Sequence, residues 1–174
     1  MASQKIIRFL FQLWIICLGF GCASSSNEMA YCPKVGVIGD LDRVTEIEMA
    51  ASQSKSNILL SSKIQGLRTK CTAGADGIAI SIVFDLFSQL SRYNIPTDVD
   101  LRYLIAIVNL NDQILAKQVY RTTVSFMDGI RTTRNTQEVE VFIPSLGDVN
   151  FRNHKVLVGF ELTEAQLKYN RGIR

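Results

Sequence analysis

The stretch that most limits how this chain can fold is Gly77–Leu90. Every second residue in it is large and apolar, and no helix produces that period; on a β-strand it places these side chains on one face. The residues concerned are Ile78, Ile80, Ile82, Phe84 and Leu86. The positions between them are also largely apolar, which is typical of a strand inside a sheet. We therefore expect the core to form around this segment.

Other segments of the chain show strand signals, and turn residues such as Asn111-Asp112 separate them. Almost no helical period occurs. Thr163-Glu-Ala-Gln166 is a capping box that predicts a short C-terminal helix through Tyr169. The fold class is therefore all-β: a single β-sandwich, immunoglobulin-like in architecture, over residues 32–174, with a small barrel as the alternative. The expected strands are 32–38, a short one within 42–54, then 57–70, 77–90, 101–109, 113–126, 137–143 and 155–162.

The N-terminal segment has the pattern of an export signal. Lys5 and Arg8 precede an apolar run that ends at Gly21-Cys22. The run is shorter than the roughly 20 apolar residues that span a bilayer, so residues 1–21 are interpreted as a cleaved signal peptide. A small residue before a cysteine is the mark of a bacterial lipoprotein signal, although Gly19 and Phe20 depart from the usual pattern. The alternative is ordinary cleavage near Ala23 and a soluble secreted product.

Lipid attachment would occur at Cys22, and residues 22–31 would form a flexible polar tether. Two or more acyl chains hold a protein stably at a membrane. No aspartate follows Cys22, which favours the outer membrane of a Gram-negative envelope. The folded domain would then lie in the periplasm, and the protein would contact the membrane through its N-terminal lipid.

The four cysteines can each be given a role. Cys17 leaves with the signal peptide and Cys22 receives the lipid, so Cys32 and Cys71 remain as a pair in an oxidising compartment. We therefore expect a disulfide between them. Metal binding is the alternative, but close cysteine spacing is lacking and His154 is the sole histidine, so no metal site is expected.

The remaining residues show no catalytic pattern, and we expect neither an enzyme nor a cofactor. His154 falls in a predicted loop, and the chain has no GxSxG motif. Lys5 and Arg8 supply two of the three net positive charges, so the exported part is nearly neutral and a nucleic-acid partner is not expected. The polar loop near 129–135 carries Arg131 and Arg134, which form a candidate interaction loop.

Several short motifs carry a resemblance. They are Cys32-Pro33, Cys71 near a strand end, Leu115-Ala-Lys-Gln-Val119, and Val156-Leu-Val-Gly-Phe-Glu-Leu-Thr163 running into Leu167-Lys-Tyr-Asn-Arg171. In these the chain resembles a group of small alphaproteobacterial envelope lipoproteins of unassigned function. The resemblance implies an envelope location and supplies no catalytic residues.

Together these features predict a membrane-tethered envelope lipoprotein. We expect a structural or protein-interaction module whose partner is another envelope protein, bound by strand addition at a sheet edge. The alternative is a periplasmic carrier of a small ligand or lipid, which would need a cavity lined by the apolar strands.

Overall fold

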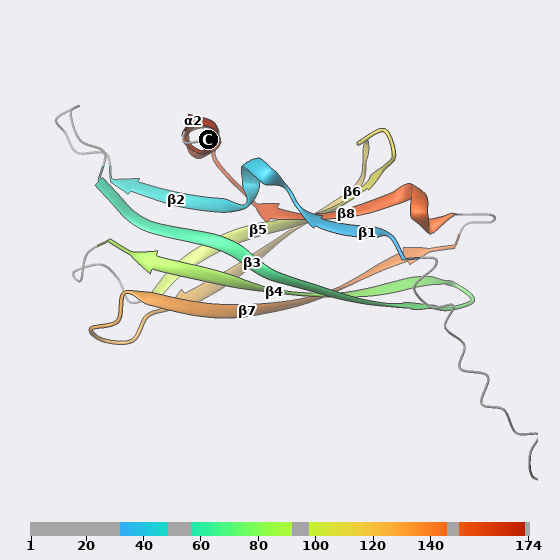
Figure 1. The fold of residues 1–174 in the computed structure, drawn as a ribbon, viewed down its shortest axis with the longest axis horizontal. Coiled ribbons are helices and arrows are strands. Elements are labelled where there is room, and N and C mark those ends of the chain that lie inside the picture. Colours follow the sequence, from blue (N-terminus) through green and yellow to red (C-terminus); the bar gives the residue numbers. More distant parts are fainter. Residues whose placement is uncertain (1–31, 49–56, 92–97, 146–149, 173–174) are drawn as a thin grey trace, which may run out of the picture.

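The computed structural model describes residues 32–48, 57–91, 98–145 and 150–172, and in them two four-stranded sheets pack face to face (Figure 1). The predicted all-β sandwich is thereby confirmed. The predicted signal peptide, Cys22, the predicted tether and the predicted loop around Pro96 lie outside the described residues.

Each sheet has its own strand order. The first sheet runs β1 (Lys34–Val37), β8 (His154–Phe160), β5 (Asp98–Asn109) and β6 (Ile114–Ser125). The second runs β2 (Arg43–Glu48), β3 (Asn57–Ala73), β4 (Gly77–Leu90) and β7 (Thr132–Pro144). The pair β1–β8 is parallel and the other pairs are antiparallel. The last strand therefore lies beside the first. Three helical segments complete the fold: η3 (Gly39–Leu41), η4 (Phe151–Asn153) and α2 (Glu164–Gly172).

The core lies between the sheets, and β4 is at its centre as the alternation predicts. The five large apolar residues of that strand are at most 1% exposed. They meet inward-facing residues of β5 and β8, among them Tyr103, Val158 and Phe160. The ring of Phe84 contacts Tyr103 edge-on, with 5.2 Å between ring centroids. Burial of such side chains is the main favourable contribution to folding.

Strand β3 keeps its predicted alternation as far as Ile64, and then a bulge breaks it. Leu60, Ser62 and Ile64 face inward and are buried. The Ser62 hydroxyl satisfies its hydrogen bonding with the Ser88 hydroxyl, 2.8 Å away. Gly66 then adopts a φ of +61°, which a side chain would disfavour, and the register with β4 shifts. This lets the chain continue as one long strand.

A disulfide links the two sheets at one end of the sandwich. Cys32 precedes β1, and Cys71 lies near the end of β3; their Cα atoms are 6.2 Å apart and the sulfurs are bonded. The predicted pairing is confirmed. It holds the N-terminal entry of the domain against the β3–β4 hairpin.

Several boundaries differ from those predicted: β5 begins at Asp98 rather than at residue 101, β3 ends at Ala73 rather than at residue 70, and two further differences concern β7 and β8. The strand expected from residue 137 already begins at Thr132, because hydrogen bonding to β4 continues as far as Gln89. His154 lies in no loop: it is the first residue of β8 and is half-buried opposite Asn109. The capping box, by contrast, is confirmed. The Thr163 N–H donates to Gln166 Oε1 (2.8 Å), the Gln166 N–H donates to the Thr163 hydroxyl (3.3 Å), and the helix ends at Gly172.

Candidate functional site

The edges of the sheets are the places where this fold can accept a partner strand. Each four-stranded sheet has two of them, so the edge strands are β1 and β2 on one side of the sandwich and β6 and β7 on the other. An edge strand offers unpaired N–H and C=O groups that another chain can bind. Which edges are covered therefore decides where binding can occur.

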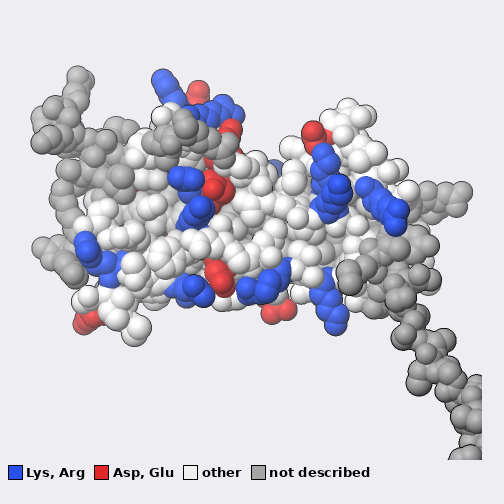
Figure 2. All heavy atoms as spheres, in the orientation of Figure 1, with Lys and Arg blue, Asp and Glu red and all other residues white. Residues whose placement is uncertain are grey.

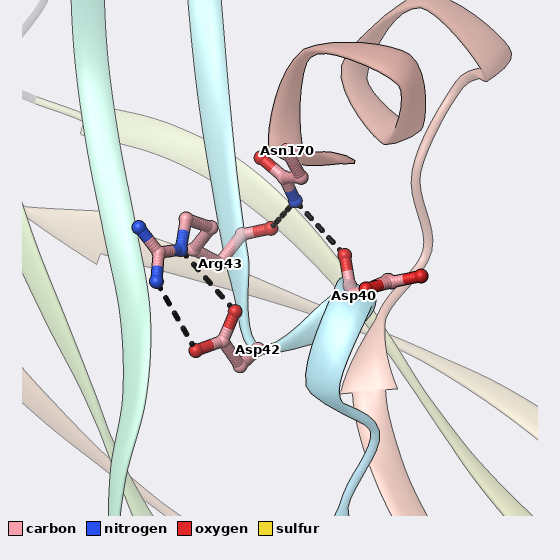
Figure 3. Close-up of polar contacts among 4 residues, drawn as sticks. All are labelled: Asp40, Asp42, Arg43 and Asn170. Atoms are coloured by element: carbon pink, nitrogen blue, oxygen red, sulfur yellow. Dashed lines mark hydrogen bonds and ion pairs between the residues drawn. The ribbon is translucent and has the colours of Figure 1, made fainter. Parts of the chain in front are cut away.

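The side with β1 and β2 is closed. Helix α2 packs beside β2 and η3 (Figure 1), and its one buried residue, Asn170, reaches the backbone there. The Asn170 amide donates to the carbonyl of Arg43 (2.9 Å) and to that of Asp40 (3.0 Å; Figure 3). Gln166 Nε2 donates to the Glu46 carboxylate (3.2 Å). The neighbouring edge strand β1 has only four residues, so it offers little to a partner.

The other side is open, and we call it the open side: the side bounded by β6 and β7. These edges are 12 and 13 residues long. They belong to different sheets, and no backbone hydrogen bond joins them in the described part of the chain. Residues 114–118 of β6 are exposed on both faces of the strand. A partner strand thus has two long edges available on one side of the molecule.

A groove runs between the two edges, with a volume of about 230 Å³. Its floor is apolar, and Lys117 and Glu140 bring opposite charges to it. Phe142 also lines it and is 55% exposed. The groove residues are Ile105, Ile107, Ala116, Lys117, Gln118, Tyr120, Glu140, Val141 and Phe142.

Polar residues at inward-facing positions explain why the sandwich opens here. Gln118 lies opposite the core residue Ile105, and Gln137 lies opposite Phe84, yet neither polar side chain is buried. Glutamine amides need hydrogen-bonding partners, so these positions stay accessible to water. The two glutamines can be found in the sequence. They indicate the open side only when the pairing of their strands is known.

Stacked aromatic rings form the inner wall beside the groove. The rings of Tyr103 and Tyr120 stack with 5.2 Å between centroids and 11° between planes. Burial raises the pKa of Tyr103 to about 12, and the neighbouring Tyr120 phenol adds to the effect. Tyr103 is therefore neutral at physiological pH.

The two arginines of the predicted interaction loop are not brought together. Arg131 donates to the carbonyl of Ser91 (3.2 Å) at the end of β4. Arg134 lies within β7 on the outer face of its sheet, 4.0 Å from the carboxylate of Asp85. The continuous loop that we predicted is therefore wrong, because residues 132–135 pair with β4.

Asp85 is the centre of a polar cluster on that outer face. It is 8% exposed, accepts a hydrogen bond from the Thr136 hydroxyl (2.8 Å) and lies 4.0 Å from Arg68 as well as from Arg134. Figure 2 shows basic and acidic side chains interspersed on this face. With its charge compensated, Asp85 is a structural carboxylate that ties three strands together.

A second hollow, of about 420 Å³, lies beside α2 at the other end of β8 from His154. It holds three carboxylates and one arginine, and each of the three acids has a partner, Glu46 through the hydrogen bond from Gln166 described above. Arg102 pairs with Glu161 (2.7 Å), and the Thr123 hydroxyl donates to Asp100 (2.7 Å). The seven residues of β8 span roughly 20 Å at strand rise, so His154 is too far away to join them in catalysis.

The described ranges hold neither a metal-binding cluster nor a membrane-spanning helix. No group of three or more His, Cys, Asp or Glu residues there could hold a metal ion. No helix among the described residues is both long and apolar enough to cross a bilayer. The site that remains is the groove with its two flanking edges.

Comparison of the chain with protein-family models, with curated proteins and with solved structures found no match. The interpretation of the open side therefore rests on its geometry.

Proposed function

We propose that this protein is a lipid-anchored lipoprotein of a Gram-negative cell envelope that acts without catalysis, as a docking module for another envelope protein. The partner presents an extended segment that adds to β6 or β7 and places a side chain in the groove. One observation carries the docking part: the open side has two long free edges, whereas α2 and η3 close the opposite side.

An uncovered sheet edge is a disadvantage to a protein, because it can pair with unwanted chains. Natural sheet proteins cover or shorten edges that would otherwise pair with other chains. This chain does so at β2, where Asn170 binds the strand backbone, and at β1, which is short. Among the described residues, no helix covers β6 or β7 in this way, and neither strand is short. In strand addition the main-chain hydrogen bonds supply affinity and the side-chain pockets supply specificity, and the open side offers both.

The anchor is supported by the sequence features of residues 1–22, by the disulfide, and by the position of Cys32 at one end of the sandwich. A test is metabolic labelling with a fatty acid. Label should be incorporated into the natural chain and into Cys17→Ala, and it should be lost in Cys22→Ala. Equal labelling of Cys22→Ala would refute the assignment.

The docking surface can be tested with a photo-crosslinking amino acid introduced in cells. We expect positions Gln118 on β6 and Glu140 on β7 to crosslink to the same partner, and Lys168 on α2 to give no such product. Phe142→Ser should lower the yield from Gln118, whereas Met127→Ser, which replaces another exposed apolar side chain, should not. Crosslinks from Lys168 alone would contradict the proposal.

The alternative, a carrier of a small ligand or lipid, is less well supported. Such a carrier buries most of its ligand in an apolar cavity of several hundred Å³. Of the two hollows described above, one is lined by charged residues and the other is a groove of about 230 Å³ between exposed strands. A lipid that co-purifies in fixed proportion with the chain would favour the carrier.

A further inference from the structure

The β5–β6 hairpin carries a cluster of apolar side chains into solvent. Leu110 is 58% exposed, Ile114 64% and Leu115 53%. In Figure 2 the hairpin forms a mostly uncharged lobe with basic side chains at its base. We call these three residues the apolar tip. Isolated exposed apolar residues need no explanation, but a cluster marks a contact surface.

The turn beneath the apolar tip is held in one conformation. The Asn109 side-chain oxygen accepts hydrogen bonds from the N–H of Asn111 (2.9 Å) and of Gln113 (3.0 Å). Its amide nitrogen donates to Gln113 Oε1 (2.8 Å). The tip is thus presented on a preorganised turn, which lowers the entropic cost of binding a surface.

The apolar tip lies at the end of the sandwich where the chain enters the domain. Strand pairing forms one row across the first sheet: Lys34 lies opposite Lys155, Lys155 opposite Val108, and Val108 opposite Ile114. Cys32 is two residues before Lys34 and is bonded to Cys71 at this same end. The entry point and the tip therefore lie at the same end of the sandwich.

Chain length then limits how far this end can be from an anchored N-terminus. Cys32 is only ten positions after Cys22, so nine residues lie between them. Whatever their conformation, they span at most about 35 Å. If Cys22 is lipidated, the short connection holds the tip close to the bilayer. Even a weak affinity of the tip for the bilayer surface would then keep it bound.

The charges around the tip fit a phospholipid surface. Lys117 is exposed on β6 itself, Lys34 is exposed on β1 at the same end of the sheet, and Lys155 pairs with Asp112 in the turn (2.8 Å). Lysine side chains beside apolar ones are typical of segments that lie in the interface of a bilayer. A protein partner is instead expected at the open side, where the strand edges are.

We propose that the apolar tip rests in the surface of the bilayer to which the N-terminus is anchored and thereby fixes the orientation of the domain. This inference rests on the proposed lipid anchor. It assigns the tip a phospholipid surface as its partner, independently of the docking of a protein on the open side.

Tryptophan fluorescence can test the contact, because the chain has a single tryptophan, Trp14. Trp14 lies in the predicted signal peptide, and Trp14→Phe removes its fluorescence from any unprocessed chain; in the processed protein purified from membranes, Leu115→Trp places a reporter in the tip. Met127→Trp is the matched control: Met127 is 74% exposed and lies between β6 and β7 at the opposite end of the sandwich. Both proteins are reconstituted in vesicles of phosphatidylethanolamine and phosphatidylglycerol with brominated acyl chains.

We expect a blue shift and a loss of most of the fluorescence at position 115, with little change at 127. Vesicle flotation distinguishes the two proposals. If the chain floats with the vesicles but both reporters stay unquenched, the tip contact is refuted and the anchor stands. If the chain does not float, both are refuted. Equal quenching of the two reporters would also overturn the proposal, because it would mean that the domain has no fixed orientation.

Discussion

Replacement of Asn170 by alanine should cost a large part of the stability of this domain. The Asn170 side chain is 3% exposed and makes two hydrogen bonds, of 2.9 and 3.0 Å, to backbone carbonyls of Arg43 and Asp40 (Figure 3). Its loss would leave both carbonyls without these donors. An unsatisfied buried polar group costs about 1–3 kcal/mol, so with some access of water at the edge we expect a total of about 2–4 kcal/mol.

That loss is large beside the roughly 5–15 kcal/mol that stabilises a typical domain. Urea unfolding followed by circular dichroism measures it. With an m-value of about 2 kcal/mol/M, the midpoint should fall by about 1–2 M. Lys168→Ala, an exposed position on the same helix, is the control and should leave the midpoint nearly unchanged. The Asn170 variant should also self-associate, because the β2 edge would lose its cover.

If Asn170→Ala unfolds at the same urea concentration as Lys168→Ala, then the helix does not hold the β2 edge through this residue. The contrast between a closed and an open side, on which the proposed docking function depends, would then lose its basis.

Three further predictions concern the core. Gly77→Ala should destabilise the fold by about 1–3 kcal/mol, because its Cβ would lie 2.9 Å from Pro144 Cα; Gly36→Ala, with no neighbour within 4 Å, should not. Cys71→Ser should cost about 4 kcal/mol by opening a loop with a sequence separation of 39, measured against the natural chain without reductant. The Tyr103 hydroxyl loses its proton near pH 10 in the unfolded chain and near pH 12 in the folded chain. The free energy of unfolding should therefore fall by up to about 2.7 kcal/mol as the pH rises from 10 to 12. In Tyr103→Phe this fall should be smaller.

The open side and the apolar tip together suggest how the molecule is oriented. The tip lies at the end where the chain enters, whereas the groove runs along one flank between β6 and β7. A domain resting on its tip would keep that flank clear of the bilayer and accessible to a partner. The two surfaces share only the start of β6, where Lys117 borders both, and the two proposals can be tested separately.

Much of the local structure could be predicted from the sequence, because its causes are local. A period of two places alternate side chains on one face whatever the sheet, so the inward residues of β4 and the first half of β3 were predictable. The capping box acts within one helical turn, and it was predictable for the same reason. The cysteine pair followed from the export signal, since only Cys32 and Cys71 remain.

The tertiary structure alone decides which edges are covered and where the groove lies. Asn170 binds the carbonyl of Asp40, 130 residues earlier in the chain, and no local pattern predicts that pairing. Arg134 was assigned to a loop because its neighbours are polar, yet pairing with β4 makes residues 132–135 part of a strand. Strand faces are determined by the backbone of each segment. Strand neighbours are determined by packing between distant segments, and in this protein the candidate site is formed by those neighbours.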